Sequence, residues 1–319
     1  MKIYEIIIKP KSSFTTLLKG DTIFGNLCWH INYSNNSLQT LLQNYDTNPF
    51  MVVSSAFVLL TDNNTNKYIF KRPTAPEEIL FSKNEQWIQE RKERQKKQYF
   101  VLQDSSCIES IKDIYLTQEQ IKTFFYKKET LQHNTINRET CTTGSNQFAP
   151  WTISSDFYND NLNLIFFVAI DETKFTAEEL KKAFTNLGLN GFGKKASIGY
   201  GKFDVISCLE SKLFKNLSKN TNYVYTLAPF VPKQDEICEE KSYFQPFTRF
   251  GKHGDVLAKS DNPFKNPIIM MDEYSLIKLN KPIDYNYPII GSAITNVSNI
   301  DVNTIAQGYT LCLPVNLED

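Results

Sequence analysis

The stretch Gly191-Phe-Gly-Lys-Lys-Ala-Ser-Ile-Gly-Tyr-Gly-Lys202 contains four glycines and three lysines within twelve residues. Glycine readily adopts a positive φ, and it lets backbone N–H groups approach a ligand without a Cβ in the way. Consecutive amides in such a turn form a concave anion site, to which lysine side chains add charge. We therefore predict a phosphate-binding loop, with a long glycine hairpin that binds no ligand as the structural alternative. The residues predicted to bind are Gly191, Gly193, Lys194, Lys195, Ser197, Gly199 and Gly201.

The residues around this loop distinguish it from two nucleotide-binding motifs. Thr-Ala-Glu-Glu at 176–179 has the spacing of a capping box, and apolar residues then recur at helical spacing. We therefore predict a helix over 176–190, then the loop, then a strand over 202–209. A dinucleotide fingerprint has the opposite order, because it follows a strand and opens a helix. A Walker A loop needs Ser or Thr after its lysine, whereas Phe203 follows Lys202.

A helix, a basic glycine loop and a strand in this order resemble the RNA-binding RAMP proteins of CRISPR systems. Further stretches extend the resemblance over nearly the whole chain, and as an ordered set they are specific. These stretches are Leu18–Trp29, His133–Thr143, Thr248–Lys252 and Gln307–Tyr309. Together they resemble the 5′-handle-binding subunit of type III-A (Csm) effector complexes, the fourth Csm subunit.

This resemblance implies a subunit without catalytic activity that caps the repeat-derived 5′ handle of a guide RNA. The implied partners are that RNA, the large polymerase-type subunit and the repeated backbone subunit. The resemblance implies no cofactor, no metal, no membrane and no small-molecule substrate. It also assigns RNA contacts to a hairpin and to a second basic turn, at His133, Asn134, Asn137, Arg138, Arg249 and Lys252. Arginine suits bidentate phosphate contact and asparagine suits sugars or bases, but Cys141 stands where the family commonly has glycine.

Two other classes of function stay open. His133, Arg138 and Lys194 could supply the base and the cations of a metal-independent precursor-RNA endoribonuclease. The other two histidines lie far away in sequence, so no second proton-transfer group is indicated. A protein-interaction module is the third class, in which the basic segment 83–98 contacts a partner and the glycine loop is only structural. The acidic residues form no two-metal constellation, so metal-dependent nuclease chemistry is not indicated.

The composition is that of a globular protein with no overall charge. The chain has 319 residues, 41% of them hydrophobic, and a formal net charge of zero. A neutral chain does not coat nucleic acid non-specifically, because that mode depends on summed positive charge. Six cysteines without a C-x-x-C pair give neither a zinc spacing nor a disulfide framework, and free thiols fit a reducing cytoplasm. The charged N-terminus and the lack of a long apolar run predict a soluble, cytoplasmic protein.

The order of the predicted elements indicates an α+β fold. The β-branched run Lys2–Lys9 predicts a first strand, and Asp21 is predicted to cap the helix after it. The apolar run Leu162–Ile170 predicts a central strand buried on both faces. With an insertion at about 76–150 left out, the order is β-α-β-β-α-β, that of a ferredoxin-like (RRM-like) domain. Further elements are predicted as a helix at Leu38–Tyr45, strands at Met51–Thr61 and Lys67–Lys71, and a helix start at Thr117–Gln120.

The C-terminal part predicts a smaller, β-rich domain. The Asn- and Lys-rich segment 212–222 separates it from the first domain as a linker. We predict an N-terminal ferredoxin-like domain over 1–210 and a degenerate ferredoxin-like unit over 220–319. The strands expected in the second unit are Tyr223–Val231, Pro267–Met271, Ser275–Leu279, Pro288–Thr295 and Gly308–Val315.

Overall fold

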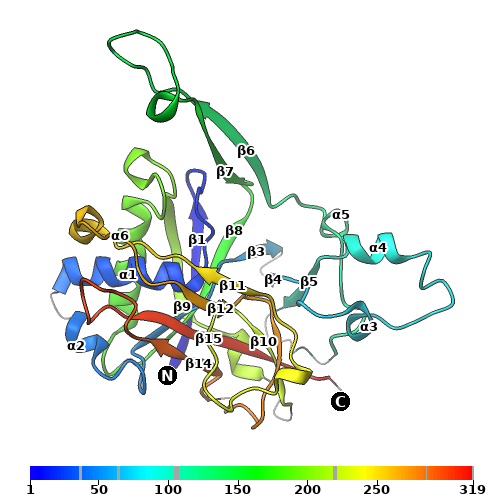
Figure 1. The fold of residues 1–319 in the computed structure, drawn as a ribbon. Coiled ribbons are helices and arrows are strands. Elements are labelled where there is room, and N and C mark those ends of the chain that lie inside the picture. The colour runs from blue at the N-terminus through cyan, green and yellow to red at the C-terminus, as the bar shows by residue number, and fades with distance from the viewer. Residues whose placement is uncertain are drawn as a thin grey trace.

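The computed structural model describes residues 1–35, 38–62, 65–103, 108, 110–217, 221–284 and 286–317. Cys107, the turn residues 63 and 64, the linker residues 218–220 and the last two residues of the chain lie outside this range. Many antiparallel strands and few helices make up the chain (Figure 1), which confirms the predicted α+β class. Within the described residues, no helix has the length and apolar character needed to cross a membrane.

The largest sheet has seven strands, and each of its neighbouring pairs is antiparallel. The strand order is β5-β4-β3-β8-β1-β9, and β2 pairs with β8 beside β3. The predicted central strand is β8, which is buried along nearly its whole length and lies between β1 and β3. The strands are β1 (Lys2–Pro10), β2 (Met51–Val53), β3 (Phe57–Asp62), β4 (Thr65–Lys71), β5 (Tyr99–Gln103), β8 (Asn163–Ile170) and β9 (Phe203–Glu210).

The two longest helices each follow a strand of this sheet, α1 (Gly20–Asn35) after β1 and α6 (Ala177–Asn190) after β8. The predicted capping box at the start of α6 is confirmed. Thr176 Oγ1 accepts the amide of Glu179 at 3.2 Å, and the Glu179 carboxylate accepts the amide of Thr176 at 2.8 Å. The apolar face of α6 is buried, as its spacing predicted. Short helices complete the set: α2 (Leu38–Leu42), α3 (Glu77–Leu80), α4 (Arg91–Lys96) and α5 (Gln118–Ile121).

The single strand predicted at Met51–Thr61 is wrong, because the chain leaves the ladder between β2 and β3. Ser54 Oγ accepts the amide of Phe167 at 2.8 Å, so a side chain replaces the backbone partner there. The amide of Ser55 turns to the carbonyl of Leu227 at 2.8 Å, in the C-terminal part of the chain. Both serines are buried, and these bonds satisfy polar groups that the break would otherwise leave unpaired.

A second sheet of four strands, in the order β13-β10-β15-β14, comes from the C-terminal part. It packs against the first sheet: the Tyr225 ring lies 5.4 Å from Phe100, and the Tyr225 hydroxyl donates to the carbonyl of Lys71 at 2.8 Å. All five predicted strands have a counterpart, while β11 was not predicted and pairs with β12. The strands of the C-terminal part, including the separate β11–β12 pair, are β10 (Tyr223–Thr226), β11 (Pro246–Arg249), β12 (Ile268–Met271), β13 (Leu276–Lys278), β14 (Ile289–Ile294) and β15 (Ala306–Val315).

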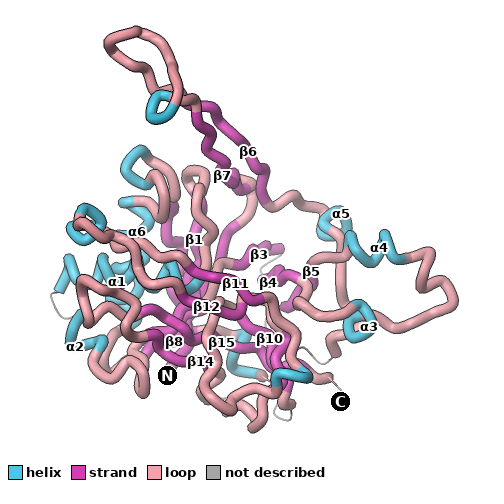
Figure 2. The backbone as a smooth tube through the Cα atoms, viewed as in Figure 1, coloured by secondary structure: helices cyan, strands magenta, loops and turns pink. Residues whose placement is uncertain are grey.

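The predicted insertion contributes β5 to the main sheet, and other parts of it form two projections (Figure 2). The basic segment 83–98 is helical only at α4, where the Arg94 guanidinium lies 3.7 Å from the centre of the Trp87 ring. Strands β6 (Tyr126–His133) and β7 (Trp151–Tyr158) form a long two-stranded ribbon that stands away from the body. Short 3-10 turns are η1 (Asn146–Phe148), η2 (Ala196–Ile198), η3 (Leu213–Asn216), η4 (Glu239–Lys241) and η5 (Asp255–Lys259).

Candidate nucleic-acid interface

The glycine loop joins α6 to β9 and is held against the segment that follows β1. All four of its glycines, at 191, 193, 199 and 201, have a positive φ between 72° and 99°. A Cβ on Gly193 would lie 2.5 Å from the side chain of Thr16, so only glycine fits this contact. Thr16 Oγ1 then accepts the amide of Lys194 at 2.9 Å, and the Thr15 hydroxyl donates to the Lys194 carbonyl. The backbone N–H and carbonyl of Lys194 are therefore both held by the segment that follows β1.

Most backbone amides of the loop donate hydrogen bonds within the protein, so only a few of them are left to bind an anion. The amides of Gly191, Gly199 and Gly201 donate to the carbonyls of Leu187, Ala196 and Ser13 at 2.8 to 2.9 Å. These three glycines shape the loop, and their N–H groups do not point to a ligand. Among the described residues, the amides without an acceptor are those of Gly193, Lys195 and Ser197. An anion here would be held by these amides and by the lysine side chains.

The loop meets the β6–β7 ribbon through Lys195. Its Nζ lies 4.3 Å from the centre of the Trp151 ring, at the start of β7. On the facing strand, the His133 ring stacks on Trp151 with centroids 4.6 Å apart and planes 18° apart. The structure thus brings together a lysine, a partly exposed indole and an imidazole from two stretches about sixty residues apart in sequence. Trp151 was missed by the sequence analysis, because a single tryptophan before a strand gives no signal of its contacts.

The other predicted hairpin residues lie in the loop beyond this stack. Asn137 pairs with Thr142 through its amide, and its side-chain oxygen accepts the amide of Glu139 at 2.9 Å. Asn134 and Arg138 are exposed in this loop, whereas Asn137 is half-buried. Cys141 has φ of 54°, a conformation that glycine adopts without strain, so the cysteine occupies a turn that still has glycine geometry.

The second basic turn is engaged within the protein through an ion pair. Arg249 Nε and Nη2 donate to the Asp21 carboxylate at 2.6 and 2.9 Å, and the Asp21 side chain is only 7% exposed. The predicted capping role of Asp21 is wrong, since α1 begins one residue earlier and Asp21 lies in its first turn. Burial raises the pKa of Asp21, and the Arg249 guanidinium opposes that rise. Lys252 Nζ lies 5.9 Å from the centre of the exposed Phe264 ring.

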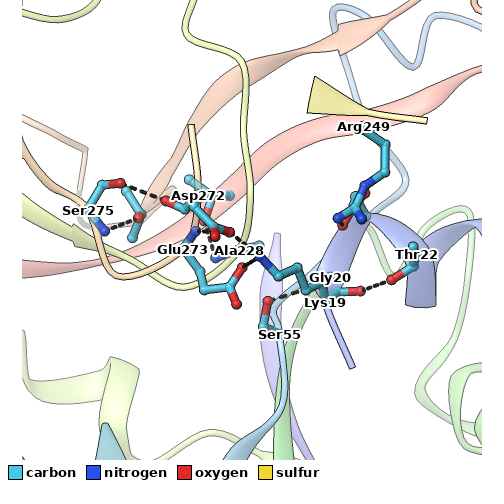
Figure 3. A network of polar contacts seen from close by, with 12 residues as sticks. Lys19, Gly20, Thr22, Ser55, Ala228, Arg249, Asp272, Glu273 and Ser275 are labelled. Atoms are coloured by element: carbon cyan, nitrogen blue, oxygen red, sulfur yellow. Dashed lines mark hydrogen bonds and ion pairs between the residues drawn. The ribbon is translucent and has the colours of Figure 1, made fainter. Parts of the chain in front are cut away.

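A second polar cluster lies beside this pair, at the start of α1 (Figure 3). Lys19 Nζ contacts the carboxylates of Asp272 and Glu273, the second at 3.2 Å, and lies 4.8 Å from the centre of the Phe247 ring. A Cβ on the next residue, Gly20, would lie 2.3 Å from the carbonyl of Val53, so the backbones approach closely here. One lysine faces two carboxylates that are largely shielded from water, and the cluster therefore carries a net negative charge when both are ionised.

Glu273 should make the stability of the protein depend on pH. Burial, helped by neighbouring Asp272, raises the pKa of Glu273 from 4.5 to about 8, and Lys19 opposes the rise. The folded protein then holds a proton that the unfolded chain releases, so the free energy of unfolding should fall as pH rises between these two values. Glu273→Gln should remove this contribution, and urea unfolding at pH 5 and pH 8 would measure it. Glu93→Gln, in an exposed pair with Lys96, should leave the pH dependence unchanged.

Comparisons with known proteins agree on one family. The family model of the RAMP superfamily matches residues 10–204, well over half of the chain. The chain belongs to the RAMP superfamily. No curated protein sequence matches it. This RAMP protein is similar in fold to a chain of a Csm1–Csm4 cassette solved with pppApA, at TM-score 0.64 and 16% identity, covering 100% of both chains. It is also similar to a chain of a Csm3–Csm4 subcomplex from a type III-A interference complex, at TM-score 0.60 and 16% identity, covering 99% and 100%.

The cysteine and acidic residues of this RAMP protein show no sign of a metal centre in the part of the chain that the structure describes. No group of three or more His, Cys, Asp or Glu side chains there has the arrangement of a metal site. His133 Nε2 is buried and has no hydrogen-bond partner among the described residues, and its ring faces Trp151. The imidazole therefore presents a flat ring to Trp151, an arrangement that suits stacking.

Proposed function

We propose that this RAMP protein binds guide RNA and caps its repeat-derived 5′ handle in a type III-A CRISPR interference complex. The observation that carries the proposal is the stack of Lys195, Trp151 and His133 between the glycine loop and the ribbon. A cation beside aromatic faces suits unstacked single-stranded nucleotides, because the rings stack on bases while the ammonium contacts phosphate. A zero net charge fits a protein that holds one short RNA segment locally.

The RNA contacts are divided between the loop and the ribbon. Lys194 and Lys195, with the amides of Gly193, Lys195 and Ser197, would hold phosphate oxygens. Arg138, Asn134 and Asn137, in the ribbon loop, would position the sugar-phosphate chain or contact bases. Arg249 would take part through the guanidinium nitrogen that Asp21 does not use, with Lys252 beside it.

The proposal also covers the partner subunits and the domain organisation. Similar chains occur with Csm1 and with Csm3 in solved complexes, which supports a cytoplasmic subunit that bridges the large polymerase-type subunit to the repeated backbone subunit. The strand order β9-β1-β8-β3, with a helix after β1 and after β8, supports a ferredoxin-like domain over residues 1–210. The region 220–319 would be a second, degenerate unit, although its first residue lies outside the described range.

The protein would act without catalysis. A ribonuclease needs a base and an acid on the two sides of a phosphate, with the base oriented by another group. Among the described residues, no carboxylate is hydrogen-bonded to His133, and its Nε2 is covered. His253, a second histidine, is buried and bonded to Ser298 at 2.8 Å, so it supplies no exposed acid.

Purification of the tagged protein from its host, followed by sequencing of the bound RNA, would test the capping role. We expect short RNAs that share one repeat-derived 5′ end, recovered together with a large polymerase-type subunit. RNAs with random ends, or protein without RNA, would contradict the proposal. Cleavage of a repeat hairpin by the isolated protein, lost in His133→Ala, would instead identify an endoribonuclease.

Replacing Trp151 should weaken RNA binding with little loss of stability. Trp151→Leu removes the ring that positions the His133 imidazole and the Lys195 ammonium. A base could stack on the outer face of His133, and one aromatic–base stack contributes about 1–3 kcal/mol. We expect the affinity for single-stranded RNA to fall by about tenfold or more. Because the ribbon stands away from the body, the midpoint of thermal unfolding should stay close to that of the wild type. Trp151→Phe keeps an aromatic face and should retain most of the affinity, as measured by fluorescence anisotropy.

A further inference from the structure

A small cavity of about 130 Å³ lies at the foot of the β6–β7 ribbon, where the ribbon meets the main sheet. One buried water needs about 10–15 Å³ of cavity volume. The cavity therefore has room for about ten non-hydrogen atoms, roughly as many as a nucleobase contains. Six aromatic residues contribute to its walls, and exposed Tyr126 and Leu17 are among the lining residues. The aromatic residues that line it are Phe57, Tyr99, Phe125, Tyr126, Tyr158 and Tyr274.

The cavity also contains one buried carboxylate oxygen, Oδ1 of Asp156, that has no hydrogen-bond donor among the described residues. Glu273 Oε2 is buried as well, and its described contact is the ion pair with Lys19. A buried carboxylate oxygen without a donor costs free energy, so a ligand that fits this cavity should bring N–H groups.

The cavity continues the surface that is proposed to bind RNA. The amide of Gly201 donates to the carbonyl of Ser13, and Phe14 then pairs with Asp156 through both of its backbone groups, at 2.8 and 3.0 Å. The next residues along the chain, 17–19, line the cavity. One short segment therefore runs from the glycine loop to the cavity. Along the ribbon, seven residues separate His133 from Tyr126, about 23 Å, which is a reach of several nucleotides.

We propose that this cavity takes one unstacked base that carries an exocyclic amine, and that it disfavours uracil. The inference rests on the proposed function. Adenine, cytosine and guanine each carry an amine that can donate to an acceptor such as Asp156. Uracil has a carbonyl oxygen where cytosine has its amine, and this oxygen would face the carboxylate, so only the single ring N3–H of uracil could donate. The aromatic walls suit any base, so selectivity comes from the Asp156 carboxylate. Lys71, with Nζ 5.2 Å from the centre of the Tyr274 ring, supplies a cation for the phosphate of the same nucleotide.

Octacytidylate and octauridylate form a matched pair of probes, because their bases have the same ring size. They differ at C4, which carries an amine in cytosine and a carbonyl oxygen in uracil, and at the neighbouring N3. We expect the full-length protein to bind octacytidylate about five- to a hundredfold more tightly than octauridylate, the discrimination of one good base contact. Asp156→Asn replaces one acceptor with an N–H donor and should bring the ratio of the two affinities to about one or below. Asp62→Asn, in an exposed pair with Lys67 at a distant turn, should leave the ratio unchanged.

The outcomes separate this inference from the function on which it rests. Binding of both probes that depends on Lys194 and Lys195 but shows no preference, or a preference that Asp156→Asn preserves, would overturn the base site alone. Such a result would leave the cavity to a cationic side chain of a partner subunit. No binding of either probe would overturn the proposed function together with the inference. Tyr126→Leu, which removes one aromatic lining residue, should weaken both probes and serves as the second variant if Asp156→Asn does not fold.

Discussion

Replacing Lys194 and Lys195 together with alanine should weaken the binding of single-stranded RNA by about 150-fold or more at low salt, because each of the two charge-assisted contacts contributes about 1.5–3 kcal/mol. The dependence of log K on log salt should flatten by about 1.4, since each lost phosphate contact to a single strand contributes about 0.7. Thr15 and Thr16 hold the Lys194 backbone, so the substitutions change charge while the loop keeps its shape. Titrations at several salt concentrations would measure both quantities.

Lys181→Ala with Lys182→Ala is the matched control. These adjacent lysines are exposed on α6, ten residues or so before the loop, and the double substitution removes the same charge. If the loop is a specific phosphate site, the control should change the salt slope far less than the loop variant. An equal effect of the two variants would mean that only the total charge matters, and it would remove the loop from the interface.

The elements around the glycine loop were predictable because their signals are local. The capping box at Thr176 and Glu179 is contained in four residues, and the apolar spacing of α6 lies within three turns. The run that forms β8 is apolar without interruption, which is the pattern of a strand covered on both faces. These features depend on neighbours in sequence, and the structure has each of them.

The interface itself was only partly predictable, because its contacts are long-range. Glycine content gives the positive φ values of the loop, but it does not indicate that Gly199 and Gly201 direct their amides inward. The sequence also gives no sign that Lys195 meets Trp151, or that Asp156 is placed beside the start of α1. The residue types were informative about phosphate and base contact, whereas their partners are fixed only when the ribbon packs on the β1–α1 segment.

Asp21 and Arg249 show the same limit most clearly. The sequence predicted a separate role for each, a helix cap and an RNA contact, and they are 228 residues apart. In the structure they form one bidentate ion pair that joins the first turn of α1 to β11. Breaking such a pair should lower the free energy of unfolding, an effect that neither residue indicated by itself in the sequence.

Arg249→Met should lower the free energy of unfolding by about 3 kcal/mol, because it leaves the buried Asp21 carboxylate without its partner. Loss of the guanidinium should raise the pKa of Asp21 further, since Arg249 now opposes the effect of burial. A raised pKa in the folded state means that the folded protein takes up a proton more readily than the unfolded chain. The deficit of the variant should therefore be smaller at pH 5 than at pH 8, as urea unfolding at both values would measure.

Asp21→Asn in the Arg249→Met background distinguishes the ion pair from simple loss of packing. The amide is neutral, so it removes the unpaired buried charge and should recover part of the lost stability, with no remaining difference between pH 5 and pH 8 from this site. If the double variant is no more stable than Arg249→Met, the aliphatic stem of the arginine stabilises the fold, and the charge does not.

RNA titration of Arg249→Met beside Lys252→Ala then separates the two proposed contacts. A loss confined to Arg249→Met would reflect the displaced turn, whereas a loss in both variants, with the lower salt slope of a missing phosphate contact, would assign the turn to the RNA interface.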